Sequence, residues 1–562
     1  MHSNIITPRI ITPSAATPSA ATSNASSSLA CRSDGATRPA DAARASSPCD
    51  ATKARPLKLS GHSRTRRGIL SLGIFLGFGI LGFGISSVSA APTAPAAPAA
   101  AAPVTITVDT ANPAQEILGF GASSCWWAPE VGGWPEAQRR EILRLLYDKK
   151  TGIGLTIHRH NLGADTLDDT FLDNDMRRTQ SMLDTKTGRF DWTRDANAVR
   201  IMRDAVAAGA AQIILFVNSP PVSMTINGHG RPTTDPAAKQ DGGKLDNKTV
   251  RKTTNLAPER YADFAAYVGE ITEHFLRVDK LPIVAVSPIN EPGHHWQTPK
   301  QEGCYYTPEQ AAAVIKAVLA EFKRRSLPVR VEPTESESWG NAIPYYEPLL
   351  RDPELRAALT DLCVHSYGSN TESKRKVREW LDKNLPQARL HMSEWCDMRG
   401  KDKPTTIAGA LPFARMMIED FTVGRVRTWQ YWRGAANFGS HDGLVNYDSK
   451  THKVTPNKVF WVIGQFSRYL VKGSVMLPVK TQAPADQLLA MAARLPDGRI
   501  AVICANFTGE NKPLNIDISG KETWRQQFRA FTDAKNNIAE THASDALPPR
   551  SVATMIFRNK NK

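Results

Sequence analysis

Short apolar segments recur along the chain between residues 119 and 433, and they alternate with stretches whose apolar residues step by three and four. The segments are rich in Ile, Val, Leu and aromatic residues, as strands buried on both faces of a parallel sheet require. We predict eight such strands: Gly119–Ser124, Leu155–Leu162, Gln212–Ser219, Ile283–Glu291, Pro328–Glu335, Asp361–Gly368, Ala388–Cys396 and Val426–Arg433.

The intervening stretches have helical periodicity. In Pro258–Lys280 the larger apolar residues fall on one face. Thr307-Pro308-Glu309-Gln310 is a capping box with proline at the first helical position, which predicts a helix running towards Arg325. Alternation of this kind predicts an α/β fold, a (β/α)8 TIM barrel over residues 119–464. No GxGxxG or GxxxxGK[ST] follows a strand, which disfavours a doubly wound nucleotide-binding fold.

Beyond residue 465 the pattern changes to short strands joined by turns. Pro496-Asp497-Gly498 is a turn between two of them. The predicted strands are Gln487–Leu495, Arg499–Asn506, Leu514–Ile518 and Ser551–Phe557. We therefore predict an antiparallel β-sandwich side domain over residues 465–562. Val104–Val108 begins a segment, residues 105–118, that we expect to join this domain and bring the two ends of the chain together.

The first 104 residues have the composition of targeting and linker segments. Residues 1–60, rich in Ala, Ser, Thr and Pro, predict a disordered extension. Residues 61–90 resemble a twin-arginine signal peptide, with Arg66-Arg67, an uncharged apolar run and the cleavage site Val88-Ser89-Ala90. Residues 91–104 are a Pro/Ala linker. We expect a secreted or periplasmic protein without stable membrane association after cleavage; the alternative is an uncleaved anchor, because the run is long enough to span a bilayer.

Composition and charge narrow the function classes. The chain has 562 residues, 41% of them hydrophobic, which is ample for a core, and a formal charge of +15. The first 90 residues carry +7 of that charge, and the rest is scattered, so we predict a solvated basic surface and no nucleic-acid partner. The five cysteines after residue 90 lack CxxC spacing, which disfavours a zinc ribbon or redox pair and leaves a single disulfide open. We expect a monomer.

Carboxylates follow three of the predicted strands. The fourth strand ends in Asn290-Glu291-Pro292, the fifth in Glu335 and the seventh in Ser393-Glu394-Trp395. Catalytic groups of such barrels lie at the carboxyl ends of the strands, so Glu291 and Glu394 are expected to face each other across the mouth. Two opposed carboxylates are what glycosidic bond cleavage needs: one protonates the leaving oxygen, and the other attacks the anomeric carbon or activates water.

Asn290-Glu291-Pro292 together with Glu394 resembles the retaining glycosidases of clan A, and the chain over residues 104–560 resembles glycoside hydrolase family 30 more closely. The motifs that carry this resemblance in strand order are Gly119-Phe120-Gly121-Ala122, Arg159-His160-Asn161-Leu162-Gly163, Asn218-Ser219-Pro220-Pro221 and the closing Leu547–Thr554. The resemblance implies Glu291 as acid/base, Glu394 as nucleophile and net retention, with Asn161 and Asn218 among the substrate-binding residues.

Neighbouring polar residues are candidates for positioning the substrate and the nucleophile. Asn290 is expected to bind a sugar hydroxyl beside the reacting carbon. Arg159 is expected to hydrogen-bond Glu394 and lower its pKa, or else to form a structural ion pair with Glu335 or Asp165. His365 and Tyr367 share one face of the sixth strand. Tyr367 is a candidate to hold the nucleophile's oxygen, although either residue can instead be a core polar group.

Tryptophans cluster at the strand ends. Aromatic faces stack on the apolar faces of sugars, so these rings are candidate subsite platforms, with core packing as the alternative. They are Trp126, Trp127, Trp395, Trp429 and Trp432, the first four of which we predict to bind substrate. We predict no metal and no cofactor: His158 and His160 share a face without a carboxylate at ligand spacing, and the adjacent His294 and His295 diverge.

The loops narrow the expected substrate. Gln301-Glu302-Gly303-Cys304, with the motif at Asn218, resembles the endo-β-1,6-galactanase branch of the family. The chain departs from the family pattern at His160, where a tyrosine is expected. The long polar loop Asn227–Thr253 is expected to wall one side of a cleft. The alternatives are glucuronoxylanase, β-1,6-glucanase or glucosylceramidase-like activity, and, in another class, a non-catalytic carbohydrate-binding cell-surface protein.

Overall fold

The computed structural model describes residues 102–561, apart from residues 173, 233–253, 295, 297–299, 399–402, 521 and 543–545. The predicted amino-terminal extension, the signal peptide, most of the linker and most of the loop Asn227–Thr253 therefore lie outside the described residues.

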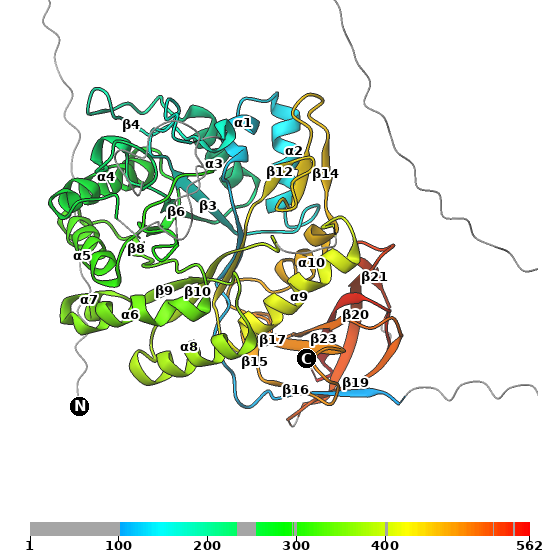
Figure 1. Cartoon of the computed structure of the whole chain (residues 1–562). Helices are drawn as coiled ribbons and strands as arrows, with labels where there is room; N and C mark the ends of the chain where they lie inside the picture. The colour runs from blue at the N-terminus through cyan, green and yellow to red at the C-terminus, as the bar shows by residue number, and fades with distance from the viewer. Residues whose placement is uncertain are drawn as a thin grey trace, which may run out of the picture. The chain divides into compact units, whose positions relative to one another are not determined.

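Eight parallel strands form one sheet that closes into a barrel (Figure 1). Ser336 pairs with Val364 across the remaining gap between the two end strands, and the His365 amide donates to the Ser336 carbonyl at 2.8 Å. The predicted TIM barrel is thus confirmed. In sheet order its strands are β8 (Arg330–Val331), β7 (Ile283–Ser287), β6 (Gln212–Val217), β3 (Ile157–Leu162), β2 (Gly119–Ser123), β11 (Thr428–Tyr431), β10 (Arg389–Trp395) and β9 (Asp361–His365).

The barrel interior is filled by side chains, as in other barrels of eight strands. Ile157, Ile214 and Ala285, from three neighbouring strands, pack together as one apolar layer. Arg159, two residues beyond Ile157, points into the same interior because alternate side chains of a strand share a face. The polar side chains at the mouth of the barrel therefore lie above this apolar layer.

Helices surround the barrel. The capping box predicted at Thr307 and Gln310 is present, with both side chain to backbone bonds formed. The helix predicted over Pro258–Lys280 consists of the 3-10 turn η3 (Pro258–Arg260), α4 and the π-helical turn η4 (His274–Val278). The α-helices are α1 (Trp127–Val131), α2 (Glu136–Tyr147), α3 (Ala196–Ala208), α4 (Tyr261–Glu273), α5 (Pro308–Arg324), α6 (Ala342–Arg351), α7 (Pro353–Ala358), α8 (Thr371–Asn384), α9 (Ile407–Thr422) and α10 (Lys458–Ser467).

Two β-sheets form the side domain and share an apolar core. The six-stranded sheet, in order, is β15 (Val475–Leu477), β17 (Leu488–Arg494), β18 (Ile500–Asn506), β23 (Ser551–Asn559), β20 (Trp524–Thr532) and β21 (Ala539–Thr541). The four-stranded sheet is β16 (Val479–Thr481), β1 (Val104–Val108), β19 (Lys512–Ile518) and β22 (Ala546–Leu547). The early strand β1 joins this domain as predicted, but it runs parallel to β19. The predictions missed β20, whose alternation is interrupted by a register shift between Gln526 and Phe528.

The helices α9 and α10 lie between the barrel and the six-stranded sheet (Figure 1). Gln465 of α10 donates to the Thr532 hydroxyl at 2.9 Å, and the Thr554 hydroxyl donates to the Gln465 carbonyl at 2.7 Å. The side domain is therefore joined to the barrel by buried hydrogen bonds as well as apolar packing. Two small sheets complete the fold: β4 (Leu183–Asp184) with β5 (Arg189–Phe190), and β12 (Ala435–Asn437) with β13 (Val445–Tyr447) and β14 (Val454–Pro456).

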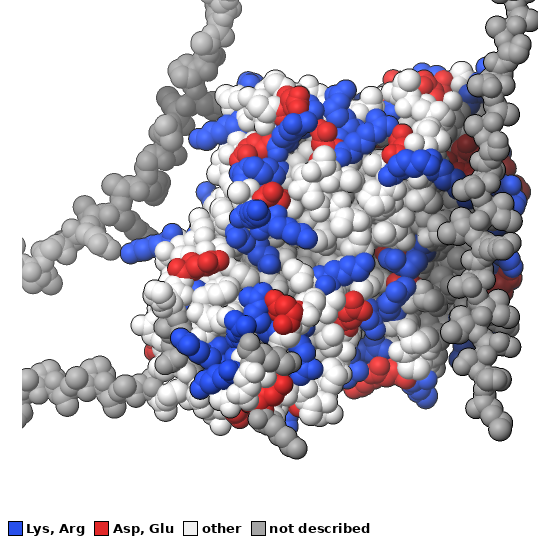
Figure 2. Space-filling model, turned by 180° about the vertical axis from the view of Figure 1, so that it is seen from behind, with Lys and Arg blue, Asp and Glu red and all other residues white. Residues whose placement is uncertain are grey.

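The surface carries mixed charge. Basic and acidic side chains are interspersed over the face that Figure 2 shows. Among the described residues, no helix combines the length and the apolar composition that crossing a bilayer requires. The five cysteines of the described part are buried free thiols: Cys125, Cys304, Cys363, Cys396 and Cys504.

Candidate active site

The two predicted catalytic carboxylates meet at the carboxyl ends of their strands. Glu291 follows β7, and Glu394 lies near the end of β10. One carboxylate oxygen of each and a ring nitrogen of His365 all lie within 4.8 Å of one another. The carboxyl groups of retaining glycosidases lie about 5–5.5 Å apart, whereas inverting enzymes separate them by about 6.5–9.5 Å. The spacing therefore suits direct attack by one carboxylate on the anomeric carbon.

The backbone holds Glu291 in an unusual conformation. Its φ is 43°, a left-handed value that costs a residue with a side chain free energy unless the surroundings enforce it. The enforcing contacts are the Glu291 amide, which donates to the Glu335 carbonyl at 2.8 Å, and the Trp296 indole, which donates to the Glu291 carbonyl at 3.2 Å. The strained backbone is thus clamped from the neighbouring strand end and aims the carboxyl into the mouth.

The environment of Glu291 suits a residue that exchanges a proton near neutral pH. Burial raises the pKa of Glu291 to about 7. His365 Nδ1 lies 2.9 Å from Glu291 Oε1, and burial lowers the pKa of His365. A neutral imidazole is therefore the form of His365 that faces Glu291 near neutral pH.

Glu394 is held by a cation and a hydroxyl. Arg159 Nη1 donates to Glu394 Oε2 at 2.6 Å, and the Tyr367 hydroxyl donates to Glu394 Oε1 at 3.1 Å. Burial raises the pKa of Glu394, while the nearby Arg159 guanidinium acts to lower it. Arg159 thus acts on the pKa of Glu394 in the predicted direction, but the net pKa is raised, because desolvation of the buried carboxylate outweighs the lowering by His365 and Arg159.

Arg159 forms both of the alternative contacts considered for it. Its Nη2 donates to Glu335 Oε2 at 2.8 Å and to Asn290 Oδ1 at 3.1 Å, while Nη1 binds Glu394. The guanidinium also stacks on the Phe216 ring, 3.5 Å from its centroid. Asp165, the other partner considered, binds Arg194 at 2.5 Å instead. One buried cation therefore links three strand ends.

Replacing this cation tests its structural role. Arg159→Met should lower the free energy of unfolding by about 3–5 kcal/mol, because two buried carboxylates lose their partner. Urea unfolding measures the loss. The control is Arg324→Met, which removes an exposed i,i+3 pair with Glu321 and should cost less than about 1 kcal/mol. A loss for Arg159→Met as small as that of the control would show that the pair does not stabilise the barrel mouth.

The predicted amide side chains divide into two groups. Asn290 accepts from Arg159 through its oxygen at 3.1 Å, a bond that does not use its amide nitrogen. Asn161 and Asn218 bond to each other at 3.1 Å, from neighbouring strands β3 and β6. Asn290 remains a candidate for binding substrate, whereas the bond between Asn161 and Asn218 orders the neighbouring strand ends.

The tryptophans predicted to bind substrate fall into two groups that differ in their surroundings. Trp127 and Trp429 are each only 1% exposed, and their indole nitrogens donate to the Ser123 carbonyl and the Asp420 carboxylate. These two rings belong to the core and offer no face to a sugar, in contrast to the prediction, because they point towards the helix layer.

Trp126 and Trp395 have surroundings of another kind. Trp126 packs edge-on against Trp432 at 5.2 Å, and the Arg177 guanidinium lies 4.5 Å from its ring centroid. Trp395 contacts Phe413 of α9 and lines a cavity beside the mouth. Sequence reasoning missed Arg177 because it lies on an irregular segment after β3, where no periodic pattern shows which strand end it approaches.

The histidines of strand β3 face away from the mouth. His158 Nδ1 lies 2.8 Å from the Tyr147 hydroxyl, and His160 contacts Phe275 of the helix layer. The departure from the family pattern at His160 therefore falls behind the strand. Burial lowers the pKa of His160 to about 4.

Two groups of described residues have the spacing of metal ligands. They are Glu291, His365 and Glu394 at the mouth, and Glu332, Asp361 and His391 elsewhere in the barrel. In each group a guanidinium already binds a carboxylate: Arg159 binds Glu394, and Arg389 binds Asp361 at 2.6 Å. In each group, one carboxylate is therefore already engaged in an ion pair with an arginine.

Comparison with known proteins agrees with this geometry. Residues 103–345 match the model of O-glycosyl hydrolase family 30. An endo-β-1,6-galactanase of Hypocrea rufa is 24% identical over 485 residues, covering 78% of this chain and 92% of that protein. A conserved exported protein from Bacteroides fragilis is similar in fold, with a TM-score of 0.70, 20% identity, and coverage of 80% of this chain and 100% of that one. The catalytic domain of the family 30 xylanase C from Talaromyces cellulolyticus has a TM-score of 0.63 and 21% identity, with coverage of 81% and 100%. Over residues 103–345 the chain is therefore similar to O-glycosyl hydrolase family 30.

Proposed function

We propose that the protein is a retaining endo-β-1,6-galactanase with Glu394 as nucleophile and Glu291 as acid/base. The observation that carries the mechanism is the spacing of the two carboxylates, whose nearest oxygens lie within 4.8 Å. Such close carboxylates favour the retaining mechanism over the inverting one, in which a wider separation makes room for a water.

In the first step, Glu394 Oε1 or Oε2 forms a bond to the anomeric carbon while the glycosidic bond breaks. The proton of Glu291 passes to the leaving oxygen, so Glu291 becomes a carboxylate and Glu394 becomes a glycosyl ester. A pKa of about 7 keeps Glu291 largely protonated in slightly acidic solution, which suits this role. Arg159 and Tyr367 hold the attacking carboxylate in place.

In the second step, the Glu291 carboxylate takes a proton from water. The water oxygen bonds to the anomeric carbon, the bond to Glu394 breaks, and the product keeps the anomeric configuration of the substrate. The role proposed for the Asn290 amide nitrogen is to donate to a sugar hydroxyl beside the anomeric carbon, in a bond that strengthens in the transition state and lowers the barrier.

The substrate proposal rests on the relative from Hypocrea rufa, an endo-β-1,6-galactanase that is aligned over 92% of its length. The Gln301–Cys304 loop, whose sequence resembles the same branch of the family, is held in place by side-chain contacts. Arg177 Nη1 donates to Gln301 Oε1 at 2.8 Å, and Glu302 is buried and bound by the hydroxyls of Thr166 and Thr179. This loop is therefore tied to the segment after β3, and Arg177 carries the connection to the Trp126 ring.

Arabinogalactan side chains stripped of arabinose are the substrate to try first. We expect oligomeric galactose products and release of reducing ends from the β-1,6-galactan, with much slower attack on glucuronoxylan and β-1,6-glucan. Chromatography of the products separates endo from exo action. If either of the other two polymers is cut faster, the galactose assignment is wrong while the catalytic pair can stand. Absence of cleavage of any β-linked polysaccharide would instead favour a non-catalytic carbohydrate-binding protein.

A further inference from the structure

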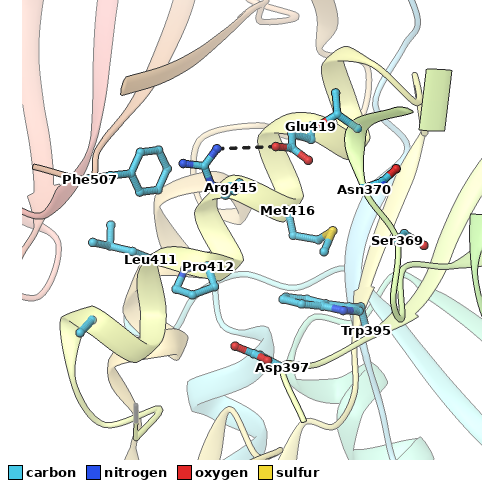
Figure 3. A pocket seen from close by; sticks show the side chains of 12 residues that line it. Ser369, Asn370, Trp395, Asp397, Leu411, Pro412, Arg415, Met416, Glu419 and Phe507 are labelled. Carbon is cyan, nitrogen blue, oxygen red and sulfur yellow. Dashed lines mark ion pairs between the residues drawn. The ribbon is translucent and has the colours of Figure 1, made fainter. Parts of the chain in front are cut away.

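A cavity of about 550 Å³ lies at the carboxyl end of β10 (Figure 3). Neither Glu291 nor Glu394 belongs to its lining. This volume lies in the range of small-molecule sites, roughly 300–1,000 Å³. Its walls come from the loop after β9 and the start of α8, the end of β10, one side of α9 from Ala408 to Glu419, and Phe507 of the side domain. The barrel and the side domain thus both contribute to it.

Two residues that line the cavity are close in sequence to residues of the proposed catalytic site. Trp395, which lines it, follows Glu394 directly, and Ser369 lies two residues after Tyr367. Successive side chains of a strand point to opposite faces, so Glu394 faces the barrel interior while Trp395 faces α9 and the cavity. Glu394 and the cavity therefore lie at the same end of the barrel.

The lining combines apolar faces with hydrogen-bonding groups. Trp395, Leu411, Pro412 and Phe507 present carbon surfaces, in the arrangement that Figure 3 shows. Pro412 has no backbone N–H, so the carbonyl of Ala408, one turn earlier on the cavity wall, lacks its usual helical donor. An apolar wall with a nearby backbone acceptor matches a sugar, whose C–H faces stack on rings and whose hydroxyls donate.

The cationic groups at the cavity already have carboxylate partners. Arg415 lies over the Phe507 ring at 4.2 Å and pairs with Glu419 at 3.7 Å. Behind them, Lys374 pairs with Glu419 at 3.2 Å and with Asp420 at 3.0 Å. Asp397 adds a further carboxylate to the lining. An anionic sugar would meet as much negative as positive charge, so the site suits a neutral one.

We propose that this cavity, the α9 cavity, is an accessory subsite that binds a neutral sugar residue of the polysaccharide whose backbone is cut at Glu394. The proposal rests on the proposed function for the identity of that polymer. The Arg415 guanidinium, kept in place by Phe507 and Glu419, and the Ala408 carbonyl bind hydroxyls, while Trp395, Pro412 and Phe507 pack on the ring.

Steady-state kinetics of the full chain with two substrates test the subsite. One is debranched β-1,6-galactan, which can reach the cavity, and the other is 4-nitrophenyl β-galactoside, which is too short to do so. Arg415→Ala and the filling variant Ala408→Phe should each raise KM for galactan about five- to tenfold, with kcat within about twofold. Both should leave kcat/KM for the aryl galactoside unchanged. The matched control is Arg140→Ala, which removes another helix arginine paired with a glutamate at i,i+4.

The outcomes separate the subsite from the proposed function. Unchanged galactan KM in both variants would overturn the subsite, and so would equal losses on the two substrates, which mark a folding defect. A loss restricted to an acidic polymer such as glucuronoxylan would overturn the assignment to a neutral sugar. If the parent enzyme cuts another neutral polysaccharide instead of galactan, the galactan assignment fails. The same KM comparison on that polymer then decides the subsite.

Discussion

Glu394→Ala is expected to lower kcat on every substrate by at least about 10⁴-fold, which corresponds to about 5.5 kcal/mol of barrier. The reason is that no other group can form the glycosyl ester in the first step. Adding azide should restore cleavage of an activated aryl β-galactoside, because the space left by the carboxylate admits a small nucleophile. The product should then be the α-glycosyl azide, identified by NMR.

The control for this variant is Glu347→Ala, which removes an exposed carboxylate on α6 and should leave kcat unchanged. Two results would contradict the assignment. One is a first product of inverted configuration from the parent enzyme, and the other is azide rescue that yields a β-glycosyl azide. Either would place the nucleophile elsewhere or replace it with water.

Glu291→Gln is expected to discriminate between substrates by leaving group. On galactan, kcat/KM should fall by about 10²–10⁴-fold, because the leaving sugar oxygen needs a proton. On a dinitrophenyl β-galactoside, whose leaving group is stable as an anion, kcat/KM should fall less than about tenfold. The quantity compared is kcat/KM because it reports the glycosylation step, whereas kcat also includes hydrolysis of the ester.

The pH dependence follows from the raised pKa of Glu291. The first step needs the protonated acid, so kcat/KM of the parent enzyme on galactan should fall as pH rises through about 7. In Glu291→Gln this decline should be absent from the profile with the dinitrophenyl substrate. A decline that persists unchanged in the variant would assign that titration to a group other than Glu291.

Local sequence patterns were sufficient to predict the barrel strands, the capped helix α5 and the early strand β1 of the side domain. Buried strands need runs of apolar residues, and a helix start needs particular side chains, so both leave signals within a few residues. The same local signals placed Glu291 and Glu394 at strand ends. The strand β20 was not predicted, because its register shift breaks the alternation of apolar and polar residues from which strands are predicted.

The contacts among the catalytic side chains were decided by the tertiary structure. A register shift between Met392 and Glu394 in β10 aligns Glu394 with His365, and the closure of β8 onto β9 brings Glu335 to Arg159. Contacts of this kind join residues far apart in the chain, and their geometry depends on strand register, which no local pattern specifies.

The sequence by itself determined which residue types stand at the ends of the strands, because side-chain alternation and strand burial are local properties. Only the tertiary structure decided how each tryptophan packs, with Trp395 lining a cavity and Trp127 and Trp429 held in the core, since a strand end and the start of its helix can turn a ring in either direction. It also decided the electrostatic surroundings of the pair: Glu291 and Glu394 are both buried, which raises the pKa of each, and the Arg159 guanidinium binds Glu394. The pKa of a buried group depends on its desolvation and on all the charges packed around it, and these follow from the three-dimensional structure and not from local sequence.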